Sequence, residues 1–307
     1  MTGERDFIAS RLAPLATTPA ARGLQDDAAV WTPPLGRELV FTHDVLACGV
    51  HYLPSDPPSD IAWKLLAVNL SDLAAMGAAP AGVLMGLGLS AAEDDDWRDA
   101  FTTGLGRALQ HFGVALWGGD TVNGLAAAVL GLTAIGHIDP GQALSRSGAQ
   151  PGDDVWVSGT IGDAGLGLAT AQGNAPVDKY LLNRFRRPEP RLALGRALVG
   201  IATACMDISD GLLIDADRMA RASNVSLSID LAAMPLSPAA AARTVNNADR
   251  IARATAGDDY ELLFTAPPGV TIDAGKIPIT RIGIVTTGVG VTLADDITLP
   301  QRLGWEH

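Results

Sequence analysis

Cys205-Met206-Asp207-Ile208-Ser209-Asp210-Gly211 is the stretch that decides how this chain is organised. An apolar strand ends at Asp207, and Gly211 opens a helix that continues to about Ser223. Asp207 and Ser209 lie on one side of the extended segment, and Asp210 stands at the helix entrance. A helix N-cap needs only one such side chain. Two carboxylates and a hydroxyl so close together therefore predict a polar site where a buried strand meets a helix.

Five further aspartate motifs share this character. They are Gln25-Asp26-Asp27, Thr42-His43-Asp44, Asn69-Leu70-Ser71-Asp72, Gly118-Gly119-Asp120-Thr121 and Gly257-Asp258-Asp259-Tyr260. A carboxylate at the edge of a buried segment is costly unless a positive partner neutralises it, and the chain has only three lysines. Divalent cations would supply that charge. Sites made of carboxylates and hydroxyls suit Mg²⁺ and its usual partner, a nucleotide phosphate.

Several of these motifs also have a purely structural interpretation. The two glycines before Asp120 allow the backbone to approach a phosphate whose metal Asp120 would hold. An ordinary turn capped by Asp120 is the alternative. The adjacent pairs Asp26-Asp27 and Asp258-Asp259 are costly if both side chains fold inward without a cation, but they are unremarkable in solvated turns.

Three basic features outside the aspartate motifs leave two interpretations each. His51 follows Asp44 by a short loop and either contacts a substrate or is structural. Arg146 either binds a phosphate through its fork of donors or forms a surface salt bridge. The arginines between residues 184 and 191 either bind phosphate or, because two prolines accompany them, belong to a rigid surface loop.

Strands and helices are expected to alternate along the whole chain. In the first half, strands are expected near residues 39–44, 82–89, 114–117 and 126–138, with helices near 60–76 and 94–112. In the second half, strands are expected near 154–158, 205–206, 225–231, 261–265 and 279–285. This alternation predicts α+β or α/β layering in both halves. A chain of 307 residues favours two domains of about 150 residues each, which we place at 1–145 and 146–307.

Composition excludes several classes of function. The net charge of −12 argues against non-specific binding to nucleic acid, which depends on a basic surface. An apolar content of 48% with 18% charged residues indicates a soluble globular protein. The absence of a long uninterrupted apolar stretch and of a signal segment predicts a cytoplasmic protein without a membrane span. Two cysteines do not form a disulfide framework.

Two common nucleotide-binding motifs are also disfavoured. The chain contains no P-loop sequence. The segment Ser158-Gly159-Thr160-Ile161-Gly162 follows a strand and precedes a helix, but its glycine spacing does not fit a dinucleotide-binding turn. A tight turn that packs the helix is the simpler interpretation. Any phosphate site must therefore be built from the aspartate motifs.

Taken in order, these motifs resemble a known family. The matching segments are Gln25-Asp26-Asp27-Ala28-Ala29, Asp44 with His51-Tyr52, Asn69-Leu70-Ser71-Asp72 to Gly77-Ala78, Gly118-Gly119-Asp120-Thr121, Ser145-Arg146-Ser147-Gly148-Ala149, Asp207-Ile208-Ser209-Asp210-Gly211-Leu212, Asp259-Tyr260-Glu261-Leu262 and Gly304-Trp305-Glu306-His307. The series resembles the thiamine-monophosphate kinases, which belong to the aminoimidazole ribonucleotide synthetase-like superfamily of ATP-using enzymes. Each motif is weak alone, but the ordered set over nearly the whole chain is specific.

The resemblance implies a fold, a reaction and partners. It implies an N-terminal α+β domain that dimerises through its sheet and a C-terminal α/β domain that completes the active site. It further implies a homodimer that binds ATP and several Mg²⁺ ions. The implied reaction transfers the γ-phosphoryl group of ATP directly to thiamine monophosphate, which gives thiamine diphosphate. Joining two anionic phosphates mainly requires positioning and charge neutralisation, so the lack of a nucleophile–base set is consistent with it.

The resemblance also implies roles for individual residues. The implied metal ligands are Asp27, Thr42, Asp44, Asp72, Asp120, Asp207 and Asp210, of which Asp207 and Asp210 are also the implied catalytic residues. The implied ATP contacts are Gly119, Asp120, Arg146 and Ser209, and the implied thiamine monophosphate contacts are His51, Asp258 and Trp305. Three positions depart from the family pattern: His43 replaces a usual Thr, Cys48 a frequent Glu, and Asp258 a usual Glu.

Two alternatives belong to other functional classes. One is another enzyme of the same superfamily that acts on a purine precursor, on selenide or on a carbamoyl carrier. A selenide enzyme would need a reactive Cys or Sec near the start of the chain, and a hydrogenase-maturation relative would end in Cys rather than Glu306-His307. The other alternative is a non-enzymatic, acidic Ca²⁺-binding protein, which would show regularly spaced loop ligands.

Overall fold

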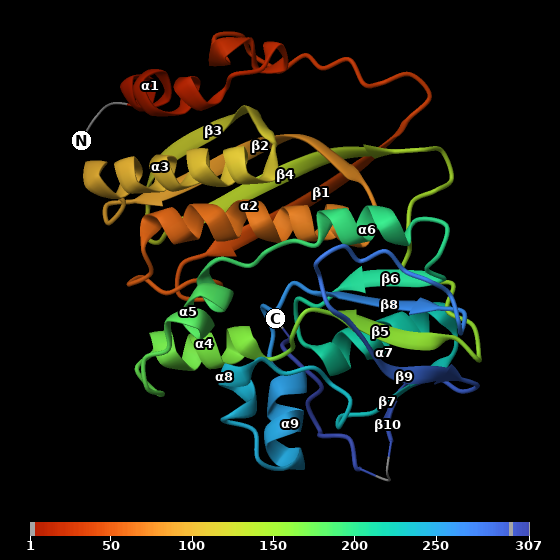
Figure 1. Ribbon diagram of the computed structural model, residues 1–307. Coiled ribbons are helices and arrows are strands. Elements are labelled where there is room, and N and C mark those ends of the chain that lie inside the picture. Colours follow the sequence, from red (N-terminus) through yellow and green to blue (C-terminus); the bar gives the residue numbers. More distant parts are fainter. Residues whose placement is uncertain (1–3, 295–296, 307) are drawn as a thin grey trace. The chain divides into compact units, whose positions relative to one another are not determined.

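The computed structural model describes residues 4–294 and 297–306, which form two compact units. The first unit contains the chain up to Leu73 together with Ala79–Pro140. The second unit contains Ala74–Ala78 and the chain from Gly141 onward. Each unit is built on its own sheet (Figure 1). A short segment from the first half of the chain thus belongs to the second unit.

A four-stranded mixed sheet forms the centre of the first unit, in the order β1-β4-β2-β3. Its strands are β1 (Glu38–Ala47), β2 (Ala79–Ser90), β3 (Ala115–Leu125) and β4 (Val129–Ile138). β4 pairs antiparallel with β1 and β2, whereas β2 and β3 are parallel. Parallel neighbours need a crossover connection, and α3 (Asp95–Phe112) supplies it.

Helices α2 (Pro58–Ala75) and α3 lie along one face of this sheet (Figure 1). α3 begins after Asp94, whose side chain accepts a hydrogen bond from the Trp97 amide at 2.9 Å. It ends at Gly113, which has the left-handed conformation that glycine favours. α2 starts slightly earlier than the helix expected near residues 60–76. The helix already begins at Pro58, since proline is well suited to the first turn of a helix.

β3 is longer than the sequence predicted. The expected strand ended at Trp117, but β3 continues through Gly118-Gly119 to Leu125. A bulge in the pairing with β2 occurs at this point. A Cβ atom on Gly119 would lie 1.8 Å from the carbonyl oxygen of Met85. Glycine is therefore required here by the pairing of the two strands, and it does not end the strand.

The opposite face of the sheet carries exposed apolar side chains. Strand registers place Phe41 and Val45 of β1 on the same face as Val129 of β4 and Val122 of β3. All four are exposed, Phe41 to 63%. Exposed apolar groups that gather on one face commonly mark an interaction surface.

An irregular N-terminal segment covers one end of that face. Its helices and turns are α1 (Glu4–Phe7), η1 (Ile8–Leu12), η2 (Ala13–Leu15) and η3 (Pro19–Leu24). Ala20 packs with Trp117 and Ile135 in a small apolar cluster, and Trp31 lies against it with its ring centroid 5.0 Å from that of Trp117. The segment therefore shields the sheet locally and leaves the remainder of the face open.

The second unit contains a six-stranded, mostly antiparallel sheet in the order β10-β7-β9-β5-β8-β6. Its strands are β5 (Asp154–Ser158), β6 (Ala204–Asp207), β7 (Ser226–Ile229), β8 (Leu262–Ala266), β9 (Ile279–Thr286) and β10 (Gly290–Leu293). Its helices are α4 (Asp163–Ala171), α5 (Lys179–Arg186), α6 (Leu192–Leu198), α7 (Leu212–Ser223), α8 (Pro238–Ala241) and α9 (Asn247–Ala254). β10 and β7 are parallel.

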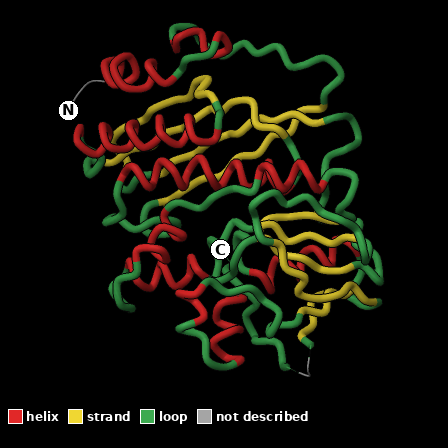
Figure 2. Tube along the Cα trace, in the orientation of Figure 1, coloured by secondary structure: helices red, strands yellow, loops and turns green. Residues whose placement is uncertain are grey.

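Apart from α6, the helices of the second unit fall into two groups. α7 packs on the sheet, and its Leu213 and Met219 share a buried core with Val155, Leu227 and Ile282. α4, α5, α8 and α9 gather beyond one end of the strands (Figure 2). Both units thus combine a sheet with covering helices, which confirms the predicted two-domain α+β or α/β layering.

The end of α2 takes part in the core of the second unit. Ala74 and Ala75 pack with Leu194 and Leu198 of α6. The approach is close, because a Cβ atom on Gly195 would lie 2.0 Å from the carbonyl oxygen of Ala74. Among residues 4–294 and 297–306, no helix is both long and apolar enough to cross a membrane.

Candidate active site

β1 and α2 bring three predicted metal ligands of the first unit together. Thr42 and Asp44 project from the helix-covered side of β1, and the Thr42 hydroxyl donates a hydrogen bond to the Asp72 carboxylate. Asn69 lies one turn before Asp72 on α2. Its side-chain oxygen accepts a hydrogen bond from the backbone amide of Asp44 at 2.9 Å. Asn69 is fully buried and donates to the Leu65 carbonyl. A buried amide thus fixes the strand and the helix to each other beside two half-buried carboxylates.

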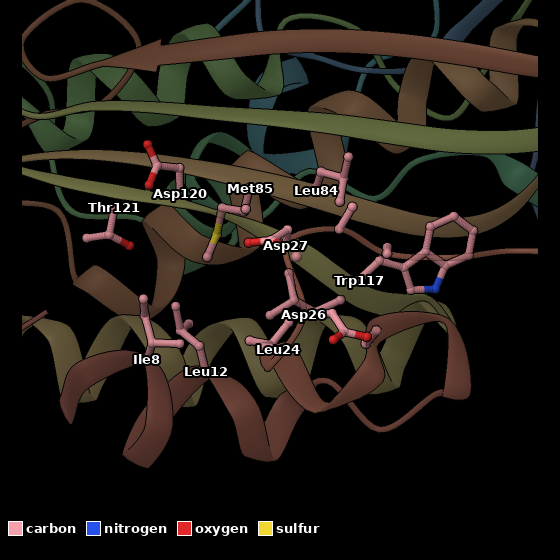
Figure 3. A pocket seen from close by; sticks show the side chains of 16 residues that line it. Ile8, Leu12, Leu24, Asp26, Asp27, Leu84, Met85, Trp117, Asp120 and Thr121 are labelled. Atoms are coloured by element: carbon pink, nitrogen blue, oxygen red, sulfur yellow. The ribbon is translucent and has the colours of Figure 1, made fainter. Parts of the chain in front are cut away.

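The other two predicted metal ligands of the first unit, Asp27 and Asp120, line a cavity of about 430 Å³ (Figure 3). Asp27 and Asp120 contribute exposed carboxylates, and Gly119 contributes backbone. The remaining wall is largely apolar and includes Met85 and Trp117. The cavity combines apolar surface with an acidic rim, which is a common composition for a small-molecule site.

Asp26, the neighbour of Asp27, takes a different part. It is exposed and forms an ion pair with Arg22 at 2.6 Å. The solvated-turn interpretation therefore holds for Asp26. An exposed ion pair of this kind contributes little to stability.

His51 is held by backbone contacts on both sides. Its Nδ1 accepts the Ala47 amide at 3.1 Å, so the neutral ring carries its proton on Nε2. Its carbonyl oxygen accepts a hydrogen bond from the ammonium group of Lys64 at 2.9 Å, and Lys64 is only 2% exposed. The imidazole is therefore oriented with Nε2 as a hydrogen-bond donor, which suits contact with an anionic group.

In the second unit, the 207–211 segment is held by a residue that the sequence did not single out. The buried Asp215 carboxylate accepts the amides of Ser209 at 3.1 Å and Asp210 at 3.0 Å. Arg218 pairs with Asp215 at 2.8 Å and with Asp210 at 2.5 Å. Burial raises the pKa of Asp215 to about 6, although the Asp210 amide and Arg218 oppose the rise.

Helix capping does not account for the polar side chains of this segment. Neither Ser209 nor Asp210 caps the helix, since Gly211 is the N-cap residue and no side chain bonds there. Asp215 instead reaches back from inside the helix to the amides that precede it. The signal for this role is an aspartate on the apolar face of α7, which is costly to bury without hydrogen bonds. The side chains of Ser209 and Asp210 therefore take no part in capping α7.

Three of the predicted site motifs meet at this segment. The Asp258 amide donates to the Ser209 carbonyl at 2.8 Å, and the Trp305 amide donates to the Asp210 carbonyl at 2.9 Å. Asp207, at the end of β6, is 8% exposed, and Trp305 is 51% exposed. Residues predicted to bind metal, nucleotide and substrate are therefore neighbours within the second unit.

Arg146 is the predicted residue least connected to this group. Its side chain is exposed, and its carbonyl oxygen accepts a weak hydrogen bond of 3.4 Å from Ser223 at the end of α7. The structure fixes the backbone of Arg146 near α7 but shows no ordered contact that would select its phosphate-binding interpretation over a surface one.

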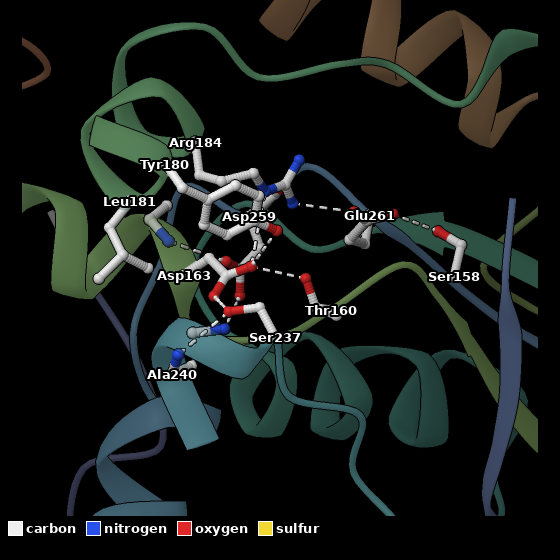
Figure 4. A network of polar contacts seen from close by, with 12 residues as sticks. Ser158, Thr160, Asp163, Tyr180, Leu181, Arg184, Ser237, Ala240, Asp259 and Glu261 are labelled. Atoms are coloured by element: carbon white, nitrogen blue, oxygen red, sulfur yellow. Dashed lines mark hydrogen bonds and ion pairs between the residues drawn. The ribbon is translucent and has the colours of Figure 1, made fainter. Parts of the chain in front are cut away.

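The arginines at residues 184 and 191 do not belong to a surface loop. Arg184 lies in α5 with its side chain 11% exposed, and Arg191 is 15% exposed. Both pair with the buried Glu261, Arg184 at 2.8 Å (Figure 4) and Arg191 at 2.5 Å. The surface-loop interpretation is wrong for these two, whose guanidinium groups bind a buried carboxylate of the chain itself. The sequence contained one signal for this pairing. Glu261 directly precedes an apolar strand, where a buried carboxylate needs a basic partner, and the chain has few lysines.

Two neighbouring carboxyls of this network differ in protonation. Burial opposes ionisation of Glu261, but Arg191 and Arg184 outweigh it and lower its pKa. Asp259 is equally buried, and its direct partners are the amides of Gly162 at 2.6 Å and Ala164 at 3.3 Å. Burial therefore prevails and raises the pKa of Asp259 to about 8.

Among the described residues, no three His, Cys, Asp or Glu side chains converge closely enough to enclose a metal ion. The donor set nevertheless fits Mg²⁺, because the carboxylates and hydroxyls are hard oxygen donors. Mg²⁺ in proteins usually keeps several waters and binds through one or two carboxylates plus the phosphates of a substrate. Separate carboxylates and hydroxyls, such as the Thr42 hydroxyl beside the Asp72 carboxylate, suit that mode better than a closed protein cage does.

Comparison with known proteins agrees with this chemistry. The family described as "AIR synthase related protein, N-terminal domain" matches residues 25–138, and the corresponding C-terminal domain matches residues 150–293. The thiamine-monophosphate kinase of Caulobacter vibrioides is 40% identical, over 99% of this chain and 90% of its own.

Solved structures give the same result. The thiamine-monophosphate kinase of Stenotrophomonas maltophilia K279a superposes with a TM-score of 0.84 at 38% identity, over 96% of this chain and 98% of its own. AaThiL complexed with AMPPCP and TMP superposes with a TM-score of 0.80 at 30% identity, over 99% of this chain and 97% of its own.

The protonation of Asp259 predicts a pH-dependent stability. Its folded pKa of about 8 exceeds the ordinary value of 3.8, so the folded state holds a proton that the unfolded state releases. The stabilisation from that proton is complete below about pH 4 and is lost as pH rises through about 8. We expect the unfolding free energy of the native chain, relative to Asp259→Asn, to fall by about 1 kcal/mol per unit between pH 6 and 8.

Denaturant titrations across this pH range measure the effect. Asp273→Asn, at an exposed aspartate in the same unit, is the control and should run parallel to the native chain. Parallel profiles for Asp259→Asn as well would contradict the assignment.

Proposed function

The chain belongs to the thiamine-monophosphate kinase family, and we propose that it transfers the γ-phosphoryl group of ATP to thiamine monophosphate with the help of Mg²⁺. The observation that carries the proposal is the meeting of Asp210, Asp258 and Trp305 at the 207–211 segment. The complex of AaThiL with AMPPCP and TMP supports both substrates. The product is thiamine diphosphate.

Oxygen-bearing side chains in each unit would bind Mg²⁺. They are Asp27, Asp44, Asp72 and Asp120, with the Thr42 hydroxyl, in the first unit, and Asp207 and Asp210 in the second. Bound Mg²⁺ would neutralise the phosphate charges and orient the reacting oxygens. The chain's own contribution is to hold its carboxylates in fixed positions, through Asn69 in the first unit and through Asp215 and Arg218 in the second.

ATP would contact Gly119, Asp120, Arg146 and Ser209. Ser209 directly precedes Asp210, and its hydroxyl makes no capping hydrogen bond to α7. The hydroxyl is therefore not needed for the structure of the helix and is suited to a contact with ATP. Gly119 is already required by the pairing of β2 with β3. Its place on the cavity wall, next to Asp120, is the observation that supports a contact with nucleotide.

Thiamine monophosphate would contact His51, Asp258 and Trp305. The Nε2–H group of His51 is suited to donate to the phosphate. The thiazolium ring carries a positive charge, which an aromatic face or a carboxylate can stabilise. Trp305 offers an exposed ring and Asp258 a half-buried carboxylate beside it in the same group of segments. Asp258 is one methylene shorter than the usual Glu, so its contact would require a closer substrate.

We propose a cytoplasmic homodimer that forms through the open face of the first unit's sheet. Phe41, Val45, Val122 and Val129 provide exposed apolar surface on that face. A second copy of the chain would remove this surface from water, and each buried methylene would contribute about 0.8 kcal/mol.

The first prediction concerns activity. The purified protein with Mg²⁺, ATP and thiamine monophosphate should form thiamine diphosphate and ADP in equal amounts. Asp210→Asn should lower kcat by about 10²–10³-fold, because it removes charge from the proposed metal site. Circular dichroism should show an unchanged fold.

Asp273→Asn again serves as the control and should retain native turnover. Consumption of ATP with a different acceptor, and none with thiamine monophosphate, would favour another enzyme of the superfamily. Near-native turnover of Asp210→Asn would remove Asp210 from the metal site.

The second prediction concerns Trp305. Trp305→Ala should raise KM for thiamine monophosphate about tenfold while leaving KM for ATP unchanged, because it removes a cation–π contact worth about 1 kcal/mol together with apolar contact area. Trp305→Phe should recover most of the affinity. Steady-state kinetics with each substrate varied in turn provide the measurement. An effect confined to ATP would overturn the assignment.

The third prediction concerns oligomeric state. Phe41→Asp places a charge on the open sheet face and should convert the dimer to a monomer, as measured by analytical ultracentrifugation. Val177→Asp, at a side chain 79% exposed in the second unit, should leave the dimer intact. A native chain that sediments as a monomer at every concentration tested would exclude the proposed interface.

A further inference from the structure

The turn formed by residues 257–260 has an unfavourable backbone. Asp258 and Tyr260 have φ angles of 69° and 50°, in the left-handed region that non-glycine residues rarely occupy. Such conformations persist only where the surrounding structure enforces them, and they gather at functional sites. Two contacts enforce this turn from one side, since the amides of Asp258 and Tyr260 donate to the carbonyls of Ser209 and Ile208, both at 2.8 Å.

Glu261 holds the same turn from the other side. Its carboxylate is fully buried and accepts four close hydrogen bonds. Two come from Arg191, and Figure 4 shows the other two, from Arg184 and Ser158. Arg191 approaches with Nε at 2.6 Å and Nη2 at 2.5 Å, one on each carboxylate oxygen. This two-point geometry fixes the plane of the carboxylate as well as its charge.

The Ser158-Gly159 turn is shaped around this carboxylate. The Ser158 hydroxyl donates to Glu261 at 2.6 Å and accepts the Leu262 amide at 2.8 Å. A Cβ atom on Gly159 would lie 2.1 Å from Glu261 Oε1. The glycine-containing segment that superficially fits a nucleotide-binding turn therefore accommodates Glu261 and needs no nucleotide to explain it.

Asp259 adds a third anchor between the other two. It accepts the amides of Gly162 and Ala164 at the start of α4, and Arg184 donates to its carbonyl oxygen at 3.4 Å. Arg184 thus contacts both the side chain of Glu261 and the backbone of Asp259. The anchored residues 259 and 261 alternate with residues 258 and 260, whose amides bond to the 207–211 side.

We propose that Arg184 and Arg191 are positioning residues for Asp258: by fixing Glu261 and the backbone of Asp259, they hold the strained 257–260 turn so that the Asp258 carboxylate faces the thiamine monophosphate site. This inference rests on the proposed function for its substrate. In this role the arginines need no contact of their own with substrate or metal. They act only through the turn, so a change at either should alter substrate affinity at a distance.

Conservative substitution tests the proposal. Arg191→Lys keeps the positive charge but loses the two-point geometry, and Arg184→Lys loses contact with the Asp259 carbonyl. We expect each to raise KM for thiamine monophosphate by about tenfold or more, since small misplacements of a binding group can cost up to about 10²-fold. KM for ATP should stay within about twofold. Arg243→Lys, whose arginine pairs with Asp178 at 3.3 Å near α5 and not with Glu261, is the matched control and should change neither KM.

Hydrogen exchange provides a readout that needs no activity. The amides of Asp258 and Tyr260 should exchange at least about tenfold faster in Arg191→Lys than in the native chain, whereas amides of the α7 core should not. If the native chain makes no thiamine diphosphate, the proposed function is wrong. The exchange experiment would still test whether the arginines hold the 257–260 turn.

Three outcomes would overturn the positioning role. They are unchanged exchange at Asp258 and Tyr260, an equal rise in KM for both substrates, and a fall in kcat alone with KM for thiamine monophosphate unaltered. If Arg191→Lys fails to fold, Glu261→Gln removes the charge that both arginines hold while keeping the shape of the side chain, and the same exchange and KM results are expected of it.

Discussion

The structure depends on the cost of burying carboxylates in a chain with three lysines. An ionised carboxylate inside a protein must be paired or hydrogen-bonded. Each unit meets this requirement with groups already present. In the first unit the Thr42 hydroxyl donates to Asp72. In the second unit Arg218 pairs with Asp210 and Asp215, and two arginines pair with Glu261. Fixed scaffolds of this kind leave the solvent-facing carboxylates available for a cation.

Much of the fold was predictable because it follows from local pattern. The apolar runs that become β1, β5 and β8 are short and bounded by polar residues, and Gly113 ends α3 as glycine commonly does. The aspartates at the ends of buried segments indicated an acidic site for the same local reason. The sequence could also show that several motifs share one function, since their order along the chain matched a known family.

Other features were not predictable because they depend on partners distant in sequence. Glu261 needs Arg184 and Arg191, about 70 residues away, and no local pattern links them. The sequence predicted that the strand ends before Gly118-Gly119. Gly119 is required because it lies opposite Met85 of β2, and this close contact exists only after the two strands have paired. Asp215 looked like an ordinary helix residue until its contacts with the preceding amides were known.

The end of α2 has a consequence for how such a chain can be recombined. Ala74 and Ala75 lie in the apolar core of the second unit, against α6, although the rest of the helix belongs to the first. A gene fragment that starts after Pro140 would encode a half missing part of its own interior. Shuffling halves between homologues at that junction would therefore exchange mismatched surfaces unless α2 and α6 were inherited together.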